Sequence, residues 1–345
     1  MIRCKTCCMP ATRPDTPFVD GECQACINYR NRKNIDWDGR KKELEALLDR
    51  HDRRVIVPSS GGKDSHFQVL KLLEYGCDVT IVTARTCHLT PIGRQNIDNL
   101  ARYARTIEIV PNMTVRAKLN RLGLEMVGDI SWPEHASIFT TPLRVAADLG
   151  ISLVMYGECP QQEYGGPQGS EEAKQMTRRW VTEFGGFLGL RPSDFVGIEG
   201  ITARDMADYE LPKGLEDKGI EAHFLGQYLP WDSHHNAEVA KAHGMRTLPL
   251  PPAPSNWWFA ENLDNAQCGL HDYFGYLKYG YGRGCAQISI DVRAGRISRG
   301  AAMNWVTHND GKYPAVYAGV RDEYILSRIG LDQWRIDELI EKFKC

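Results

Sequence analysis

Four cysteines near the start of the chain have the spacing of a metal site. Cys4 and Cys7 form one Cys-x-x-Cys pair, and Cys23 and Cys26 form a second pair after fifteen intervening residues. Each pair can direct two thiolate sulfurs at one ion, and four thiolates complete the tetrahedral shell that zinc prefers. The loop between the pairs has little apolar material on which to fold without metal. The sequence therefore predicts a structural zinc knuckle, with an iron–sulfur cluster on the same four ligands as the alternative.

A glycine-rich segment has the residue types that bind phosphate. It reads Ser60-Gly61-Gly62-Lys63-Asp64-Ser65, after the apolar run 55–57 and at the start of a helical pattern over 64–75. Glycines let backbone N–H groups approach an anion, and the positive end of a helix dipole attracts it. The serine hydroxyls and the Lys63 ammonium add further donors. The segment lacks the GxxxxGK[ST] spacing of a Walker loop, so the usual γ-phosphate hydrolysis is not implied.

Strand patterns alternate with helix patterns from about residue 53 onward. Apolar runs predict strands at 55–57, 79–83, 107–110, 152–156 and 246–250. Helix patterns lie between them at 64–75, 93–105 and around 142–148. Strand, helix, strand at short spacing implies an α/β fold with a parallel sheet that helices cover on both faces. A helix capped by Asp36 is expected to dock the knuckle onto this sheet. Beyond residue 254 the sequence turns to aromatic residues and polar helices, one of them expected over 322–343.

The segment 60–65 resembles the pyrophosphate loop of the PP-loop ATPases. Enzymes of this superfamily cleave ATP between the α and β phosphates, adenylate an oxygen of their substrate, and are built on a doubly wound parallel sheet. The resemblance implies that Lys63 counters phosphate charge and that Asp64 helps to hold Mg²⁺. The implied ATP contacts are Ser60, Gly61, Gly62, Lys63, Asp64 and Ser65. The expected domains are a zinc knuckle (1–35), a connecting helix (36–52), a PP-loop domain (53–250) and a C-terminal region for substrate binding or oligomerisation (251–345).

The loop after the strand at 152–156 carries two carboxylates. Ligands of doubly wound sheets bind at the carboxyl ends of the strands, near the reversal of the strand order. Glu158 and Glu163 follow such a strand end and lie close to glycines in the sequence. Either of them is a candidate ligand for a Mg²⁺ ion that bridges the phosphates, with a solvated loop charge as the alternative for Glu163.

A narrower resemblance runs through nearly the whole chain. Its motifs, in order, are Cys4-Lys-Thr-Cys7-Cys8-Met-Pro-Ala-Thr-Arg-Pro14, Asp20-Gly21-Glu22-Cys23, Asn34-Ile35-Asp36-Trp37, the loop 60–65, Lys118-Leu119-Asn120-Arg121, Gly128-Asp129-Ile130-Ser131-Trp132-Pro133-Glu134-His135, Glu163-Tyr164-Gly165-Gly166, Asn256-Trp257-Trp258 and His271-Asp272-Tyr273. Together they resemble the N-acetyl sugar amidotransferases. The resemblance implies conversion of an acetamido sugar, nucleotide-linked or acidic, into an acetamidino sugar for a surface glycan such as lipopolysaccharide. Ammonia would come from a separate glutaminase subunit.

This resemblance assigns residues to the site. The implied catalytic residues are Lys63, Asp64, Glu158 and His135. The implied substrate contacts are Trp132, Glu134, Trp257, His271 and Arg283. Tryptophan rings would stack on a sugar or base, although core packing is an equal alternative, and Arg283 would bind a carboxylate or phosphate. His135 would be a general base and His271 a hydrogen-bond donor, with a structural role as the alternative for both.

Two other function classes remain open at this stage. PP-loop tRNA thiolases also carry a zinc knuckle, and Cys87, Cys159 and Cys268 would then be the sulfur-carrying set. A non-enzymatic module that senses adenine nucleotide is the other class. The 42 Lys and Arg residues against 44 Asp and Glu give a net charge of −2, which makes a nucleic-acid partner a weak expectation.

Composition also predicts where the protein works. Eleven cysteines without an apolar stretch at the start favour reduced thiols in the cytoplasm over a disulfide framework. The longest stretch free of charged residues is broken by prolines, so no membrane contact is expected.

Overall fold

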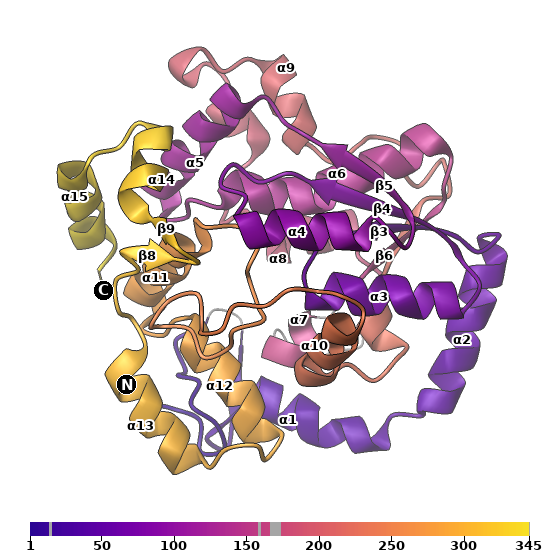
Figure 1. Cartoon of the computed structure of the whole chain (residues 1–345), viewed down its shortest axis with the longest axis horizontal. Helices are drawn as coiled ribbons and strands as arrows, with labels where there is room; N and C mark the ends of the chain where they lie inside the picture. Colours follow the sequence, from indigo (N-terminus) through magenta and orange to yellow (C-terminus); the bar gives the residue numbers. More distant parts are fainter. Residues whose placement is uncertain (14–15, 158–159, 166–173, 345) are drawn as a thin grey trace.

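A five-stranded parallel sheet forms the centre of the molecule (Figure 1). A computed structural model describes residues 1–13, 16–157, 160–165 and 174–344. The strands, in the spatial order β5-β4-β3-β6-β7, are β3 (Arg54–Pro58), β4 (Asp78–Ala84), β5 (Arg105–Ile109), β6 (Leu153–Tyr156) and β7 (Glu221–Phe224). The order reverses between β3 and β6, because Val55 pairs with Val79 on one side and with Leu153 on the other. The predicted α/β fold with a parallel sheet is thus confirmed.

Alternate residues of the three inner strands, β3, β4 and β6, enter separate cores on the two faces of the sheet. Ile56, Val82 and Val154 belong to one buried cluster with residues of α5 (Met113–Val127) and α6 (Trp132–Leu149). Val57 and Met155, each one residue away from that set, belong to the other cluster with α2 (Trp37–Arg50) and α3 (Lys63–Glu74). This period of two is what a sheet buried on both faces requires. The helices α4 (Pro91–Leu100) and α10 (Ser233–Ala242) also lie on the α3 side (Figure 1).

The strand expected at 246–250 is wrong, since this segment has no regular structure. Pro249 lies within it and Pro251 follows closely, and proline cannot donate to a strand ladder. The fifth strand is β7 instead, at Glu221–Phe224. Its Glu221 and His223 interrupt the apolar pattern, which an edge strand tolerates, and this explains why the pattern did not reveal it.

The helix expectations need three corrections. The helix expected over 93–105 ends earlier, at Leu100, and Arg105 already begins β5. The helix expected over 322–343 is broken at Gly330, which takes φ +77°, into α14 (Asp322–Ile329) and α15 (Gln333–Phe343). A left-handed glycine is a common helix ending, and Asp332 then caps the second helix. The helix expected around 142–148 is the end of the longer α6, which contains Pro142. The predicted cap at Asp36 is present, since its side chain accepts from the Gly39 N–H at 2.9 Å.

The cysteine knuckle packs against the C-terminal helices. It contains β1 (Phe18–Val19), β2 (Glu22–Cys23) and α1 (Gln24–Asn31). The Cys8 N–H donates to Ser289 Oγ at 3.2 Å, and Arg299 Nε donates to the Cys4 and Cys7 carbonyls at 3.0 and 3.1 Å. These partners belong to α12 (Arg283–Arg293) and α13 (Arg299–Asn309). The expectation that the helix after Asp36 docks the knuckle is therefore incomplete, because the leucines of α2 pack on the sheet while the knuckle rests on α12 and α13.

The remaining elements connect these parts. They are α7 (Pro160–Tyr164), α8 (Arg178–Phe184), α9 (Ala203–Met206), α11 (Cys268–Tyr279), β8 (Val316–Tyr317) and β9 (Val320–Arg321), together with short 3₁₀ turns. Among the helices of the described residues, none combines the length and the apolar character that crossing a bilayer demands.

Candidate functional site

The glycine-rich loop lies at the carboxyl end of the central strand, beside the reversal of the strand order. It leaves β3, and α3 begins at Lys63. Gly61 takes φ +80°, and a Cβ there would come within 2.8 Å of the Ile97 backbone nitrogen, so only glycine fits. All six residues from Ser60 to Ser65 line one cavity of about 610 Å³. The predicted loop thus has its open side on a cavity large enough for a nucleotide.

Lys63 is buried between carboxylates at this cavity. Its ammonium pairs with Asp64 and lies 3.7 Å from Glu261 Oε1, and only 4% of its side chain is exposed. Burial opposes ionisation of Glu261, but the charges of Lys63 and Arg283 outweigh it and hold the pKa of Glu261 below its usual range. Sequence reasoning did not identify Glu261. Its position just after Asn256-Trp257-Trp258 was the one available signal.

A third carboxylate approaches from the loop after β6. Glu163 is buried, and its Oε1 accepts from Ser233 Oγ at 3.3 Å. Burial raises the pKa of Glu163 above its usual range, and the nearby charge of Asp64 adds to this effect. Glu158, the other candidate in this loop, lies outside the described residues. Asp64, Glu163 and Glu261 together offer the oxygen donors that suit Mg²⁺.

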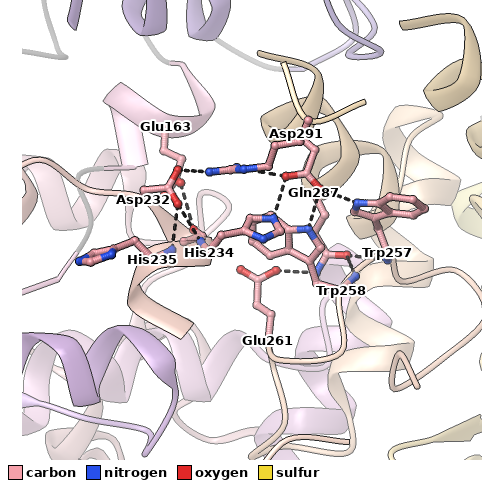
Figure 2. Close-up of polar contacts among 11 residues, drawn as sticks. Glu163, Asp232, His234, His235, Trp257, Trp258, Glu261, Gln287 and Asp291 are labelled. Atoms are coloured by element: carbon pink, nitrogen blue, oxygen red, sulfur yellow. Dashed lines mark hydrogen bonds and ion pairs between the residues drawn. The ribbon is translucent and has the colours of Figure 1, made fainter. Parts of the chain in front are cut away.

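Figure 2 shows a hydrogen-bonded cluster around Asp291, and two of its neighbours, Trp258 and Glu261, lie against Lys63. Asp291 accepts from His234 Nε2 at 2.8 Å, Trp257 Nε1 at 2.7 Å and Trp258 Nε1 at 3.0 Å. Burial opposes its ionisation, yet these hydrogen bonds lower the pKa of Asp291 to about 2. The Trp258 ring lies 5.9 Å from the Lys63 ammonium, and Gln287, which holds both tryptophan backbones, also donates to Glu261. Trp257 therefore supports this cluster through Asp291.

Asp129 and His135 meet His271, from a distant part of the sequence, beside the cavity. Asp129 Oδ1 lies 2.8 Å from His271 Nδ1, and Asp129 Oδ2 lies 3.2 Å from His135 Nδ1. Burial opposes ionisation of Asp129, but the charges of the two nearby imidazoles and the hydrogen bond with His271 hold its pKa well below the usual range. Burial also opposes protonation of His135, but the Asp129 charge outweighs it and raises the pKa of His135. Sequence reasoning named both histidines and gave no role to Asp129.

Of the remaining predicted substrate contacts, Arg283 lines the cavity and Trp132 lies in the core. Arg283 lines the cavity and pairs with Asp272 at 3.2 Å. Trp132 is fully buried, donates to the Phe187 carbonyl at 3.0 Å and packs on Phe195, so it lies in the core and does not present its ring to a sugar.

Glu134 lies on the same helix as Trp132, and its side chain is buried in a network of polar side chains from other segments. Its carboxylate accepts from Arg116 at 3.1 Å, Asn120 at 2.7 Å and Gln267 at 2.9 Å. Such a fully bonded carboxylate holds the surrounding helices together. Glu134 also lines a cavity that shares Ser60, Asp64 and Ser65 with the cavity at the loop 60–65.

Three neighbouring cavities make up the cleft. The cavity at the phosphate loop adjoins two others of about 390 and 400 Å³, and all three share His135 and Arg283 as wall residues. His135 and Arg283 thus lie where the three cavities meet. Parallel strands bring their carboxyl ends to one edge, which explains why residues from separate strands converge here.

The cysteines predicted for sulfur transfer lie in different places. Cys268 lines the main cleft, whereas Cys87 lines a separate cavity with His88 and Arg328. Burial raises the pKa of the Cys87 thiol to about 12 and raises that of Cys268 well above its usual value. Both effects disfavour the reactive thiolate. Cys159 lies outside the described residues.

The knuckle cysteines come together as the spacing predicts. Cys4 and Cys26 place their sulfurs 3.8 Å apart, Cys7 and Cys23 are 3.6 Å apart, and Cys23 and Cys26 are 3.5 Å apart. Tetrahedral zinc with Zn–S bonds of about 2.3 Å separates its sulfurs by roughly 3.8 Å. Backbone N–H groups of Thr6 and Cys23 point at Cys4 Sγ, at 3.4 and 3.3 Å. This buried group could therefore hold a structural zinc.

Comparison with known proteins gives one family match. Residues 255–345 match a family described as "LPS biosynthesis protein WbpG-like, C-terminal domain". The curated proteins include no match. The matched segment contains Glu261, His271, Arg283 and Asp291, so it supplies one wall of the cleft.

Proposed function

We propose that this protein is an ATP-dependent amidotransferase of lipopolysaccharide or related surface-glycan synthesis. It would replace the acetamido oxygen of an N-acetyl sugar with nitrogen, to give an acetamidino sugar, AMP and pyrophosphate. The observation that carries the proposal is the shared cleft, in which the loop 60–65 faces His135, His271 and Arg283. The similarity of residues 255–345 to a lipopolysaccharide biosynthesis family supports the glycan context.

The chemistry requires activation of a poor electrophile. The acetamido oxygen attacks the α-phosphorus of ATP and pyrophosphate leaves, which converts the amide oxygen into part of a leaving group. Ammonia then adds to the same carbon and loses a proton, and the carbon–oxygen bond breaks to release AMP with the former amide oxygen.

The residues of the cleft would divide this work. N–H groups of the loop 60–65 and the Lys63 ammonium would bind the phosphates. Asp64, Glu163 and Glu261 would hold Mg²⁺, which neutralises phosphate charge when bound. His135 would take the proton from ammonia, because Asp129 favours its protonated form. Arg283 would bind an acidic group of the sugar or its carrier. A separate glutaminase would supply the ammonia.

An isotope experiment tests the reaction. The protein is incubated with ATP, ammonia and N-acetyl sugars labelled with ¹⁸O in the acetamide. We expect ¹⁸O in AMP and ¹⁵N from labelled ammonia in a basic sugar product. ADP with orthophosphate in place of AMP, or AMP without label, would contradict adenylation of the amide.

A glutamine experiment tests the predicted partner. Glutamine should support turnover only after a glutaminase is added, whereas free ammonia at high pH should suffice alone. Efficient use of glutamine by the single purified chain would exclude the separate partner.

A further inference from the structure

The Asp129, His135 and His271 side chains have the composition of a metal site. Asp129 precedes α6, His135 lies in its first turn and His271 lies on α11, so three separate positions of the fold supply the three groups. One carboxylate oxygen and two imidazole nitrogens lie within 4.8 Å of one another. Two histidines with one carboxylate are a donor set of catalytic zinc and of non-haem iron sites.

The spacing of the donor atoms fits one shared ion. Zinc bonds of about 2.0–2.2 Å at angles between about 90° and 110° place neighbouring ligand atoms roughly 2.9–3.5 Å apart. The two Asp129 oxygens lie 2.8 Å from His271 Nδ1 and 3.2 Å from His135 Nδ1. Both imidazoles thus turn the same type of nitrogen toward one carboxylate. Small rotations of the rings would bring the three groups to coordination distance.

The nitrogen of His135 is available for an ion. His135 Nδ1 is buried and makes no hydrogen bond to any described residue, although it lies near Asp129. A Cβ at Gly186, which takes φ +79°, would stand 2.7 Å from this nitrogen, so the glycine keeps that space open. A buried nitrogen that makes no hydrogen bond costs free energy, and a metal ion shared with the Asp129 carboxylate would satisfy it.

The carboxylate is held in place by its surroundings. The Ser131 N–H donates to Asp129 Oδ1 at 2.8 Å. The Lys278 ammonium donates to the carbonyl of Val127, two residues before Asp129, at 2.9 Å, and so fixes the backbone that leads to the carboxylate. Hydrogen bonds that fix a ligand's orientation are a regular feature of metal sites.

We propose that Asp129, His135 and His271 bind a divalent transition metal of the zinc or iron class, with an open coordination position toward the cleft. All three residues line the cavity of about 390 Å³ beside the phosphate loop cavity. Three protein ligands leave room for a water molecule or a substrate atom on the ion. This site is separate from the four-cysteine knuckle, and metal binding to it is measured without substrate. An ion here would occupy the lone pair of His135 Nδ1, so a water molecule on the ion would take over the role of base that the proposed reaction otherwise gives to this histidine.

Metal content of the purified full chain tests the site. We expect about two metal ions per wild-type chain, one in the knuckle and one here. His271→Ala and His135→Ala should each retain about one, while His308→Ala, an exposed histidine on α13, should retain about two. The proposal is overturned if the wild type holds one metal ion that the cleft variants keep, and also if variants of both cleft histidines keep two.

Cobalt titration of the metal-free wild type gives a readout independent of variant folding. Cobalt in the knuckle produces intense thiolate-to-metal charge-transfer bands. Cobalt on two histidines and a carboxylate produces only weaker d–d bands. We expect a second equivalent that adds d–d absorption without added charge transfer, and saturation after one equivalent refutes the site.

Discussion

Gly61→Ala is the substitution that tests the phosphate loop most directly. The residue has φ +80°, so alanine there carries the strain of a left-handed conformation, about 1–2 kcal/mol. Its Cβ would also lie 2.8 Å from the Ile97 nitrogen and 2.9 Å from Ile97 Cγ1. Backbone cannot move aside cheaply, so the loop itself must shift, at an additional cost of about 1–3 kcal/mol.

Gly76→Ala is the matched control for this change. Gly76 follows α3, has φ +72° and has no atom within 4 Å of an added Cβ, so it carries the conformational strain without the clash. Urea unfolding of both variants isolates the clash as the difference between them. We expect Gly61→Ala to be less stable than Gly76→Ala by about 1–3 kcal/mol.

Nucleotide binding then connects the clash to function. A loop displaced from α4 no longer aims its N–H groups at the phosphates, and a loss of about 1.4 kcal/mol would weaken ATP binding tenfold. Calorimetric titration with ATP should show at least about this loss for Gly61→Ala and near-normal binding for Gly76→Ala. Equal stability and equal ATP affinity of the two variants would refute the assignment of this loop.

Three other changes follow from the structure. Asp291→Asn should lower the free energy of unfolding, measured with urea at pH 7, by about 2 kcal/mol. Because the pKa of Asp291 is lowered to about 2, the stability that the carboxylate contributes is full above about pH 4 and is lost as the pH falls toward 2. An unchanged stability of the variant would contradict this reasoning. Cys23→Ser should lose the knuckle metal and lower the melting temperature. A metal-free wild type with the same melting temperature as the metal-bound wild type would contradict this prediction. Lys63→Ala should slow ATP–pyrophosphate exchange on the order of a thousandfold, whereas the exposed-face control Lys71→Ala should leave it near normal.

Local patterns predicted the parts of the site that local physics determines. The Cys-x-x-Cys pairs and the loop 60–65 are compact motifs, because neighbouring residues alone shape them. The sheet followed from alternating strand and helix patterns, except for β7. That edge strand contains Glu221 and His223, which hydrogen-bond to each other at 2.9 Å. The apolar run that predicts a strand is therefore missing from its sequence.

The sequence did not predict which residues are buried in the core or which distant residues make contact. Trp132 and His135 are three residues apart on α6, yet one packs in the core and the other lines the cleft. Helix periodicity cannot tell which side meets a cavity until the neighbours are known. Glu261 reaches Lys63 across about two hundred residues of chain, and only the folded molecule reveals that pair.

The position of the knuckle has a consequence for the cleft. It rests on α12 and α13, and α12 carries both Arg283, in the cleft, and Asp291, which accepts from Trp258. Arg293 of the same helix approaches Cys7 Sγ at 3.9 Å and donates to the Glu163 carbonyl at 3.0 Å. The four cysteines therefore brace the segment similar to the lipopolysaccharide biosynthesis family, together with the loop that carries Glu163. A metal in the knuckle would stabilise the walls of the cleft through Arg293 and α12.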